Sequence, residues 1–233
     1  MADMLRILLA SLAGAFLVTA CGTTPAPVFY PNRGAERVEA PAAITATASV
    51  SAEQGPFQPD ADLYLCPNST ITNAFAYDDN LRVIDFNPII LVDGKVVMAS
   101  VPTNNACMTS GFGHRMGRTH KGLDFRSRPA GMVYSAAPGT IREAKRSPSF
   151  GNTILIDHGQ GVFTRYAHLA NIEAGVEAGR DIGFGQPLGI MGTTGRSTGI
   201  HLHFEVLTGS YPSSLTAYNP LSFPPYIGLT AAY

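Results

Sequence analysis

Residues 119–125 alternate polar and apolar side chains in a way that could carry metal chemistry. On an extended strand, side chains two positions apart share a face. His120, Gly122 and Asp124 therefore lie on one face, while the leucine and phenylalanine of the segment face the core. Histidine and aspartate both supply ligand atoms for divalent metals. The glycine fits this hypothesis, because a larger side chain there would crowd an ion held by its neighbours.

Residues 201–205 repeat the pattern. Alternation on a strand puts His201, His203 and Glu205 on one face, and the intervening leucine and phenylalanine anchor the other face in the core. Each of the two segments thus presents a polar edge from an apolar anchor. A carboxylate on the same face as a histidine can also orient an imidazole that binds a metal. The alternative for Glu205 is an exposed charge at the end of a strand.

Each pattern has an ordinary explanation when it is taken alone. A His-x-His pair on a strand can be a surface coincidence, and His120 and Asp124 can simply form a salt bridge. Two such faces in one chain, with His168 shortly after Tyr166, are hard to explain as core histidines. Imidazole and carboxylate ligands suit zinc, and three protein ligands with one open position are typical of a catalytic zinc site.

Taken together, three motifs resemble the signatures of lysostaphin-type zinc metalloendopeptidases, whose catalytic domains are called LytM domains. The motifs are His120-x-x-x-Asp124, Tyr166-Ala167-His168-Leu169, and the run from Gly195 through His201-Leu202-His203 to Glu205. The run Ser110 to Arg115 is similar to the start of that domain. The resemblance covers about Ser110 to Pro220, roughly half of the chain.

The resemblance implies a fold, a cofactor and a division of roles. It implies a mainly β fold: a compact antiparallel β domain with a narrow open groove and little helix. It also implies one zinc ion per chain, bound by His120, Asp124 and His203, with His168 and His201 as a catalytic pair that does not bind the metal. The substrate class that it implies is bacterial peptidoglycan.

The chain departs from the family pattern in one place. The stretch between Arg115 and His120 is short, where many relatives have a longer loop that borders the groove, so substrate choice is in doubt. His114 lies beside this stretch and is either a turn residue or a substrate contact. Tyr166 is a further candidate near the site. His158, in a His-Gly turn after a strand, is expected to be structural.

Three functions compete. The first is a zinc-dependent endopeptidase that hydrolyses peptide cross-links or stem peptides of peptidoglycan during wall remodelling or division; the cross-link from D-Ala to a diamino acid is the first expected substrate and a glycine bridge the second. The second is a non-catalytic activator of a cell-wall amidase, which would have a divisome or amidase partner. The third, metal storage or a structural zinc, needs a closed site of four ligands, and the sequence offers three.

The N-terminus predicts export and a lipid anchor. Arg6 precedes a twelve-residue apolar run, 7–18, which is too short to span a bilayer as a helix. Small residues and Cys21 follow, as in the lipobox of bacterial lipoproteins; an ordinary signal with an incidental cysteine is the alternative. We therefore expect a signal peptide over 1–20, lipidation of Cys21 and a place in the cell envelope, on the periplasmic face of a membrane, the outer one preferred over the inner.

The two remaining cysteines, Cys66 and Cys107, form an even pair in an exported chain, which predicts one disulfide. Two free or buried thiols are the alternative. Closing a loop of this length stabilises a fold by about 4 kcal/mol in the chain-entropy model.

Composition and turn signals divide the rest of the chain. Residues 21–59 are rich in Ala, Pro and Thr and predict a disordered tether. Short β-type runs over 60–105, with an Asp-Gly hairpin signal, predict a small β segment. Strands separated by glycine turns over 106–224 predict the peptidase domain, and 225–233 form a C-terminal tail. The net charge of -1 has no basic cluster, so no nucleic-acid partner is expected.

Overall fold

The computed structural model describes residues 56–69, 71, 73–115 and 117–229. The predicted signal peptide, Cys21 and the tether up to residue 55 lie outside the described residues. Strands are the main regular structure of the described chain, and its helical segments are two short 3-10 turns, η1 (Pro220–Ser222) and η2 (Ile227–Leu229). The predicted mainly β fold is therefore confirmed. Within this described part, no helix has the length and apolar character needed to cross a bilayer.

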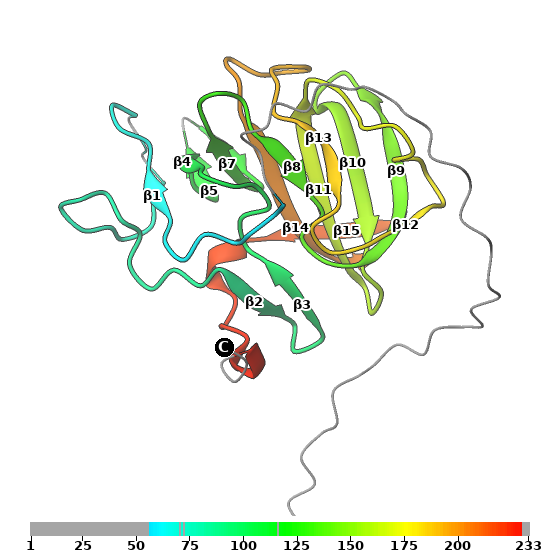
Figure 1. The fold of residues 1–233 in the computed structure, drawn as a ribbon, viewed down its shortest axis with the longest axis horizontal. Coiled ribbons are helices and arrows are strands. Elements are labelled where there is room, and N and C mark those ends of the chain that lie inside the picture. The colour runs from blue at the N-terminus through cyan, green and yellow to red at the C-terminus, as the bar shows by residue number, and fades with distance from the viewer. Residues whose placement is uncertain (1–55, 70, 72, 116, 230–233) are drawn as a thin grey trace, which may run out of the picture. The chain divides into compact units, whose positions relative to one another are not determined.

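One large sheet organises the described residues (Figure 1). Its strands pair in the order β1-β4-β7-β14-β11-β10-β9-β12, and β15 pairs with β14. Only the β1–β4 pair is parallel, and the other pairs of this sheet are antiparallel, as predicted. The bounds are β1 (Tyr64–Leu65), β4 (Cys107–Ser110), β7 (Leu123–Arg126), β9 (Gly139–Ser147), β10 (Gly151–Asp157), β11 (Val162–Leu169), β12 (Asp181–Ile182), β14 (Leu202–Ser210) and β15 (Ser214–Tyr218).

The two faces of β7, β14 and β11 divide the core from the polar residues. Leu123 lies opposite Phe204, which lies opposite Tyr166 on the next strand, and all three are fully buried. One position along, His203 lies opposite Asp124 and Ala167. Because side chains alternate along a strand, the apolar set and the polar set lie on opposite faces. Burial of the apolar set fixes the register, and the register brings His203 beside Asp124.

Three two-stranded ribbons complete the fold: β2 (Ile89–Val92) with β3 (Val96–Ala99), β5 (Gly113–Arg115) with β6 (Arg118–His120), and β8 (Met132–Tyr134) with β13 (Pro187–Ile190). The first is the hairpin predicted at Asp93-Gly94. Asp93 and Gly94 have φ angles of 50° and 65°, as a tight turn between two twisted strands requires. The Asp-Gly signal therefore predicted this element correctly.

Two predicted strands differ in the structure. Residues 82–86 form isolated bridges and no strand, because Asp85 within the run has a φ of 56° that breaks the extended chain. Residues 119–125 are not one strand: β6 ends at His120, and β7 begins at Leu123. The interpretation that a single strand carries His120 and Asp124 on one face is therefore wrong, although the two side chains still meet.

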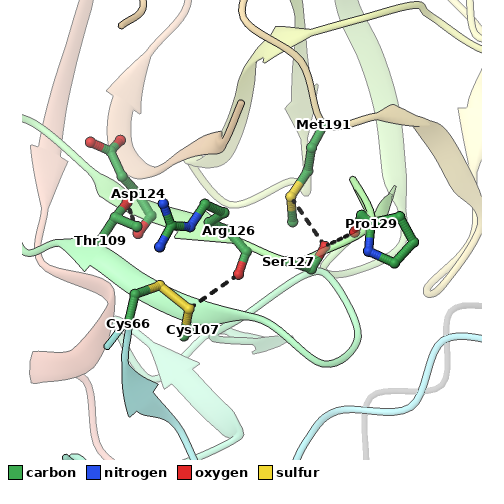
Figure 2. The surroundings of a disulfide bond; sticks show 8 residues. All are labelled: Cys66, Cys107, Thr109, Asp124, Arg126, Ser127, Pro129 and Met191. Atoms are coloured by element: carbon green, nitrogen blue, oxygen red, sulfur yellow. Dashed lines mark hydrogen bonds between the residues drawn. A yellow bond between two sulfur atoms is a disulfide. The ribbon is translucent and has the colours of Figure 1, made fainter. Parts of the chain in front are cut away.

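The N-terminal β segment is joined to the main sheet. β1 pairs with β4, and Cys66 and Cys107, whose Cα atoms are 4.9 Å apart, form a disulfide next to this pair (Figure 2). The predicted tether ends at residue 59, but Phe57 already stacks on Tyr134, with 5.0 Å between ring centroids. The ordered chain therefore includes the last residues of that predicted tether.

The predicted C-terminal tail is partly tied to the fold. Pro225 forms a bridge with Ile90, and the backbone N–H of Tyr226 donates to the carbonyl of Ile89. These contacts add a short extended segment along β2. The fold thus continues past the boundary at residue 224 that composition indicated, because backbone pairing to an edge strand needs no apolar pattern.

Candidate metal centre and groove

Three buried side chains from three adjoining elements meet at one point. His120 ends β6, Asp124 lies in β7 and His203 lies in β14. Asp124 Oδ1 is 3.1 Å from His120 Nε2 and 2.9 Å from His203 Nδ1, and the two nitrogens are 3.0 Å apart. One ligand atom from each residue lies within 4.8 Å of the others. The three predicted ligands are therefore placed so that they can hold one metal ion.

Hydrogen bonds anchor the remaining ring nitrogens and leave one nitrogen of each ring for a metal. His120 Nδ1 donates to the carbonyl of Gly111 at 2.6 Å, and His203 Nε2 donates to Glu205 Oε1 at 3.1 Å. The other nitrogen of each ring faces the Asp124 carboxylate. A proton or a metal cation can lie between these atoms, and a metal ion would use all three as ligands. The donor set thus fits a divalent metal that accepts imidazole and carboxylate ligands.

Glu205 holds His203 in place. Its second carboxylate oxygen, Oε2, accepts a hydrogen bond from Arg165 at 2.9 Å, and Glu205 is only 1% exposed. Arg165 lies directly opposite Glu205 in the β11–β14 register. The side chain that the sequence left between two interpretations therefore orients a ligand imidazole.

His168 reaches the same site because β11 contains an extra residue. Leu169 pairs with Asn152 and Tyr166 with Ile154, so three steps along β11 match two steps along β10. This bulge includes His168, whose φ is 63°. On a regular strand His168 would share the core face of Tyr166, but a bulge redirects the side chain. His168 Nδ1 donates to the carbonyl of Thr194 at 2.8 Å, which leaves Nε2 as the acceptor.

His201 lies beside His168 at the start of β14. The two ring centroids are 4.8 Å apart, and His201 Nε2 is 3.7 Å from Asp124 Oδ1. His201 Nδ1 donates to the carbonyl of Gly199 at 2.8 Å. Both imidazoles therefore present their Nε2 edge near the metal ligands and outside the ligand set.

Charge and burial set the protonation of the cluster. Burial alone would raise the pKa of Asp124, but hydrogen bonds from His120 and His203 outweigh it and hold this pKa far below its usual value. Burial would lower the pKa of His203, whereas its bonds to Asp124 and Glu205 raise it to about 9. Burial lowers the pKa of His168 to about 4, so its ring is neutral at pH 7.

The cluster forms the floor of a groove with a volume of about 540 Å³. Phe150, Ser149 and the loop over 196–200 also line it. Three arginines, Arg115, Arg126 and Arg196, also line it, against a single carboxylate, Asp124. Sequence patterns did not single out these arginines, because their positions depend on which loops meet at the groove.

Gly122 separates the two ligand-bearing strands, and the structure explains why glycine is there. A Cβ at this position would overlap the backbone carbonyl of Phe204 and contact the His203 ring. A side chain at this position would therefore be crowded. The closest atom that it would meet is the backbone oxygen of Phe204 on β14, whereas the sequence predicted crowding of the metal site itself.

Two other candidates for the site, Tyr166 and His114, lie elsewhere, and so does His158, which was expected to be structural. Tyr166 is fully buried, and its hydroxyl accepts from the backbone N–H of Ala136 at 2.8 Å, so the proposed place near the substrate is wrong. Its register opposite Phe204 puts it on the core face. His114 is exposed on β5 and does not line the groove. His158 Nδ1 donates to the carbonyl of Pro138 at 2.8 Å, away from the groove.

A contact that the sequence did not indicate joins the N-terminal segment to the metal ligands. Asn73 Nδ2 donates to the carbonyl of Gly111, the same oxygen that accepts from His120, and Asn73 Oδ1 accepts from the Gly111 N–H at 3.2 Å. A Cβ at Gly111 would overlap the Asn73 carbonyl. The only signal in the sequence for this close approach was Gly111 itself, within the run Ser110 to Arg115.

Comparison with known proteins identifies the domain. Residues 118–215 match the model of Peptidase family M23. The chain therefore carries a Peptidase family M23 domain, and this domain contains the three ligands as well as His168 and His201. The family expected from the motifs is confirmed.

Curated relatives have similar domains within longer chains. The chain is 35% identical over 141 residues to the DD-carboxypeptidase/endopeptidase Mpg of Neisseria meningitidis, a match that covers 56% of this chain and 31% of that protein. It is 38% identical over 93 residues to the peptidoglycan DD-endopeptidase ShyA of Vibrio cholerae, covering 40% of this chain and 21% of that protein. The chain thus matches less than a third of either relative's length.

A solved structure is also similar. The catalytic domain of the antimicrobial peptidase lysostaphin from Staphylococcus simulans is 33% identical, with a TM-score of 0.45. The match covers 50% of this chain and 90% of that domain.

Proposed function

We propose that this protein is a zinc-dependent endopeptidase that hydrolyses peptide bonds in bacterial peptidoglycan. The observation that carries the proposal is the convergence of His120, Asp124 and His203 on the floor of an open groove, beside the His168–His201 pair. This arrangement has three protein ligands with groove space beside them, as in catalytic zinc sites; structural sites are closed by four ligands. The site therefore favours hydrolysis over metal storage.

The chain's own residues supply positioning and proton transfer. When bound, zinc would acidify a water molecule and polarise the scissile carbonyl. His168 and His201 lie side by side with their Nε2 atoms toward the ligands, so together they can take a proton from water and return it to the leaving amine. Glu205 and the Gly111 carbonyl keep both ligand imidazoles in the required tautomer. The three arginines of the groove attract acidic substrates.

We propose the cross-link from D-Ala to a diamino acid as the bond cleaved, and a glycine bridge as the second choice. Support comes from two relatives whose names specify DD-endopeptidase activity, Mpg and ShyA. A non-catalytic amidase activator would not need the two non-ligand histidines, yet both are held in place here by backbone carbonyls. The retained pair therefore favours an enzyme.

Digestion of purified sacculi by the zinc-loaded chain tests the proposal. Mass spectrometry should find cross-linked muropeptides converted to un-cross-linked stems that keep D-Ala. His203→Ala should lack both zinc and activity, whereas Arg180→Gln, on an exposed loop away from the groove, should keep both. Intact cross-links after treatment with the zinc-loaded wild type, on direct and glycine-bridged sacculi alike, would refute the endopeptidase assignment.

A further inference from the structure

A second hollow adjoins the metal groove. It has a volume of about 910 Å³ and lies between the N-terminal segment over 60–69 and the end of β7. Ser69 and Arg126 line both the hollow and the groove, so the two spaces adjoin at these residues. The β1–β4 pair and the disulfide hold the N-terminal wall in position (Figure 2). A substrate lying in the groove can therefore extend into this hollow.

Arg126 stands at the junction. It follows Asp124 by two positions on β7, and alternation puts both side chains on the same face. Figure 2 shows its guanidinium extending back toward Asp124 and Thr109, while its backbone carbonyl faces Cys107. The residue is half-buried, and within the part of the chain that the structure describes its guanidinium has no hydrogen bond or ion pair. Such a group gains most from an anionic partner.

The hollow has more positive than negative charge once Asp62 is counted with its partner Arg82, because two arginines then face one carboxylate, Asp60. Of the two carboxylates that line it, Asp62 pairs with Arg82 at 2.6 Å, and Asp60 accepts from the backbone N–H of Asn105 at 2.9 Å. Arg128 adds a second exposed guanidinium from the β7 side. Two arginines in one hollow fit a planar carboxylate, which arginine binds in a bidentate manner.

We propose that this hollow is a specificity subsite in which Arg126, assisted by Arg128, binds a free carboxylate of a peptidoglycan stem peptide. The inference rests on the proposed function and names the feature of the substrate that the enzyme selects. Only Arg126, Ser127 and Arg128 among its lining residues fall within the family match of 118–215. The other wall comes from the N-terminal segment, so the preference belongs to this chain and not to the matched domain in general.

Binding of two matched stem peptides tests the subsite. The peptides are identical except that one carries free carboxylates and the other carries amides, and neither contains a cross-link that can be cut. Calorimetry on the full zinc-loaded chain should show the carboxylate peptide binding about tenfold more tightly at low salt. Arg126→Gln should remove this preference, and Arg126→Lys should keep part of it. Arg180→Gln is the matched control and should behave as the wild type.

Defined outcomes overturn the inference. The inference is wrong if the wild type binds both peptides with equal affinity or binds neither of them. It is also wrong if the preference for the carboxylate peptide survives in Arg126→Gln/Arg128→Gln. Inorganic phosphate that binds more tightly than the carboxylate peptide, through Arg126, would mark a small-anion site instead. The wild-type comparison needs no variant, so it stands even if a substitution impairs folding.

A kinetic arm separates this inference from the proposed function. The same two peptides are prepared as cross-linked dimers, and kcat/KM is measured for each. A carboxylate preference in binding with no hydrolysis of either dimer would refute the proposed function and keep the anion subsite. Hydrolysis of both dimers at equal kcat/KM would refute the anion subsite and keep the proposed function.

Discussion

His168 departs from the alternation of its own strand, and this departure has an energetic cost. A non-glycine residue at a φ of 63° costs about 1–3 kcal/mol. The surrounding contacts maintain it: the backbone N–H of His168 donates to the carbonyl of Phe150, and Nδ1 donates to Thr194. Strain held in this way at a groove is consistent with a positioned catalytic imidazole.

Removal of His168 or His201 should separate metal binding from catalysis. We expect His168→Ala and His201→Ala to keep one zinc per chain, because neither side chain belongs to the ligand cluster. Activity should fall by about 10²–10⁴-fold in each, because proton transfer is lost. Metal content and turnover are measured on the same preparation. Zinc lost in step with activity would show that these histidines are ligands.

His158 should make folding stability depend on acidity. Burial lowers its folded-state pKa from 6.5 to about 4, so the unfolded chain binds a proton that the folded chain resists. Stability is therefore complete above pH 6.5 and is lost as the pH falls toward 4, by about 3 kcal/mol in all. Urea unfolding of the wild type and His158→Gln at several pH values measures the difference. The two proteins share all their other titratable groups, so an equal pH dependence would contradict this assignment.

At the scale of elements, the N-terminal segment supports the metal site from outside the family match. Asn73 bonds to both the N–H and the carbonyl of Gly111, and that carbonyl fixes the tautomer of His120. The segment is itself tied to β4 by the Cys66–Cys107 disulfide. A chain of contacts thus connects the segment over 60–105 to one ligand.

Loss of the Asn73 side chain should weaken metal binding. Asn73→Ala removes two of the bonds that place the Gly111 carbonyl, so His120 is less well oriented, and we expect about a 10-fold loss of zinc affinity. Competition with a chromophoric chelator measures it. Asn80→Ala, in an exposed turn of the same segment, is the control and should bind as the wild type. Unchanged affinity in Asn73→Ala would show that β6 alone positions His120.

Reduction of the disulfide should destabilise the whole described unit. Cys66 and Cys107 are 41 positions apart, and closing such a loop contributes about 4 kcal/mol through the entropy of the unfolded chain. Denaturant unfolding with and without reductant should show this loss, and Cys66→Ala/Cys107→Ala should reproduce it without reductant. Reductant should then have no effect on the double variant. Equal stability of the oxidised and reduced wild type would contradict the prediction.

At the scale of the whole molecule, the peptidase unit is joined to an N-terminal region that lies outside the described residues. The apolar run, the small residues and Cys21 support our proposal that the chain is exported and lipid-anchored in the cell envelope. The run over 21–55, rich in Ala, Pro and Thr, would then act as a tether between the anchor and the groove. An enzyme held in this way would hydrolyse the cell wall close to the membrane that anchors it.

Replacement of the anchoring cysteine tests this arrangement. Cys21→Ala should abolish labelling with a fatty-acid analogue and shift the protein from the membrane to the soluble fraction. Its hydrolytic rate in solution should stay the same, because the change lies far along the chain from the metal ligands. Acyl labelling and membrane fractionation that match the wild type would remove the lipoprotein proposal.

The sequence predicted the β class, several of the strands and the three residues of the candidate metal cluster. Alternation placed Leu123 and Phe125 in the core, and the Asp-Gly pair placed the β2–β3 hairpin, because both depend on local periodicity and turn geometry. The spacing of His120 and Asp124 indicated a metal site, although the structure has two strands there in place of the single strand that was expected. Glycine at 122 indicated a close approach. Each of these signals is local in the chain.

Tertiary structure alone decided which residues meet across the groove. The bulge that redirects His168 depends on the pairing of β11 with β10, whereas Tyr166, two positions away, faces the core because it lies opposite Phe204 on β14. The contacts of Asn73 with Gly111 and of Arg165 with Glu205 join residues that are far apart in the chain. The place of Arg126 in the hollow likewise depends on the distant segment over 60–69. Period-two patterns predict the face of a strand, but register shifts and long-range strand pairing are set by packing of the whole sheet.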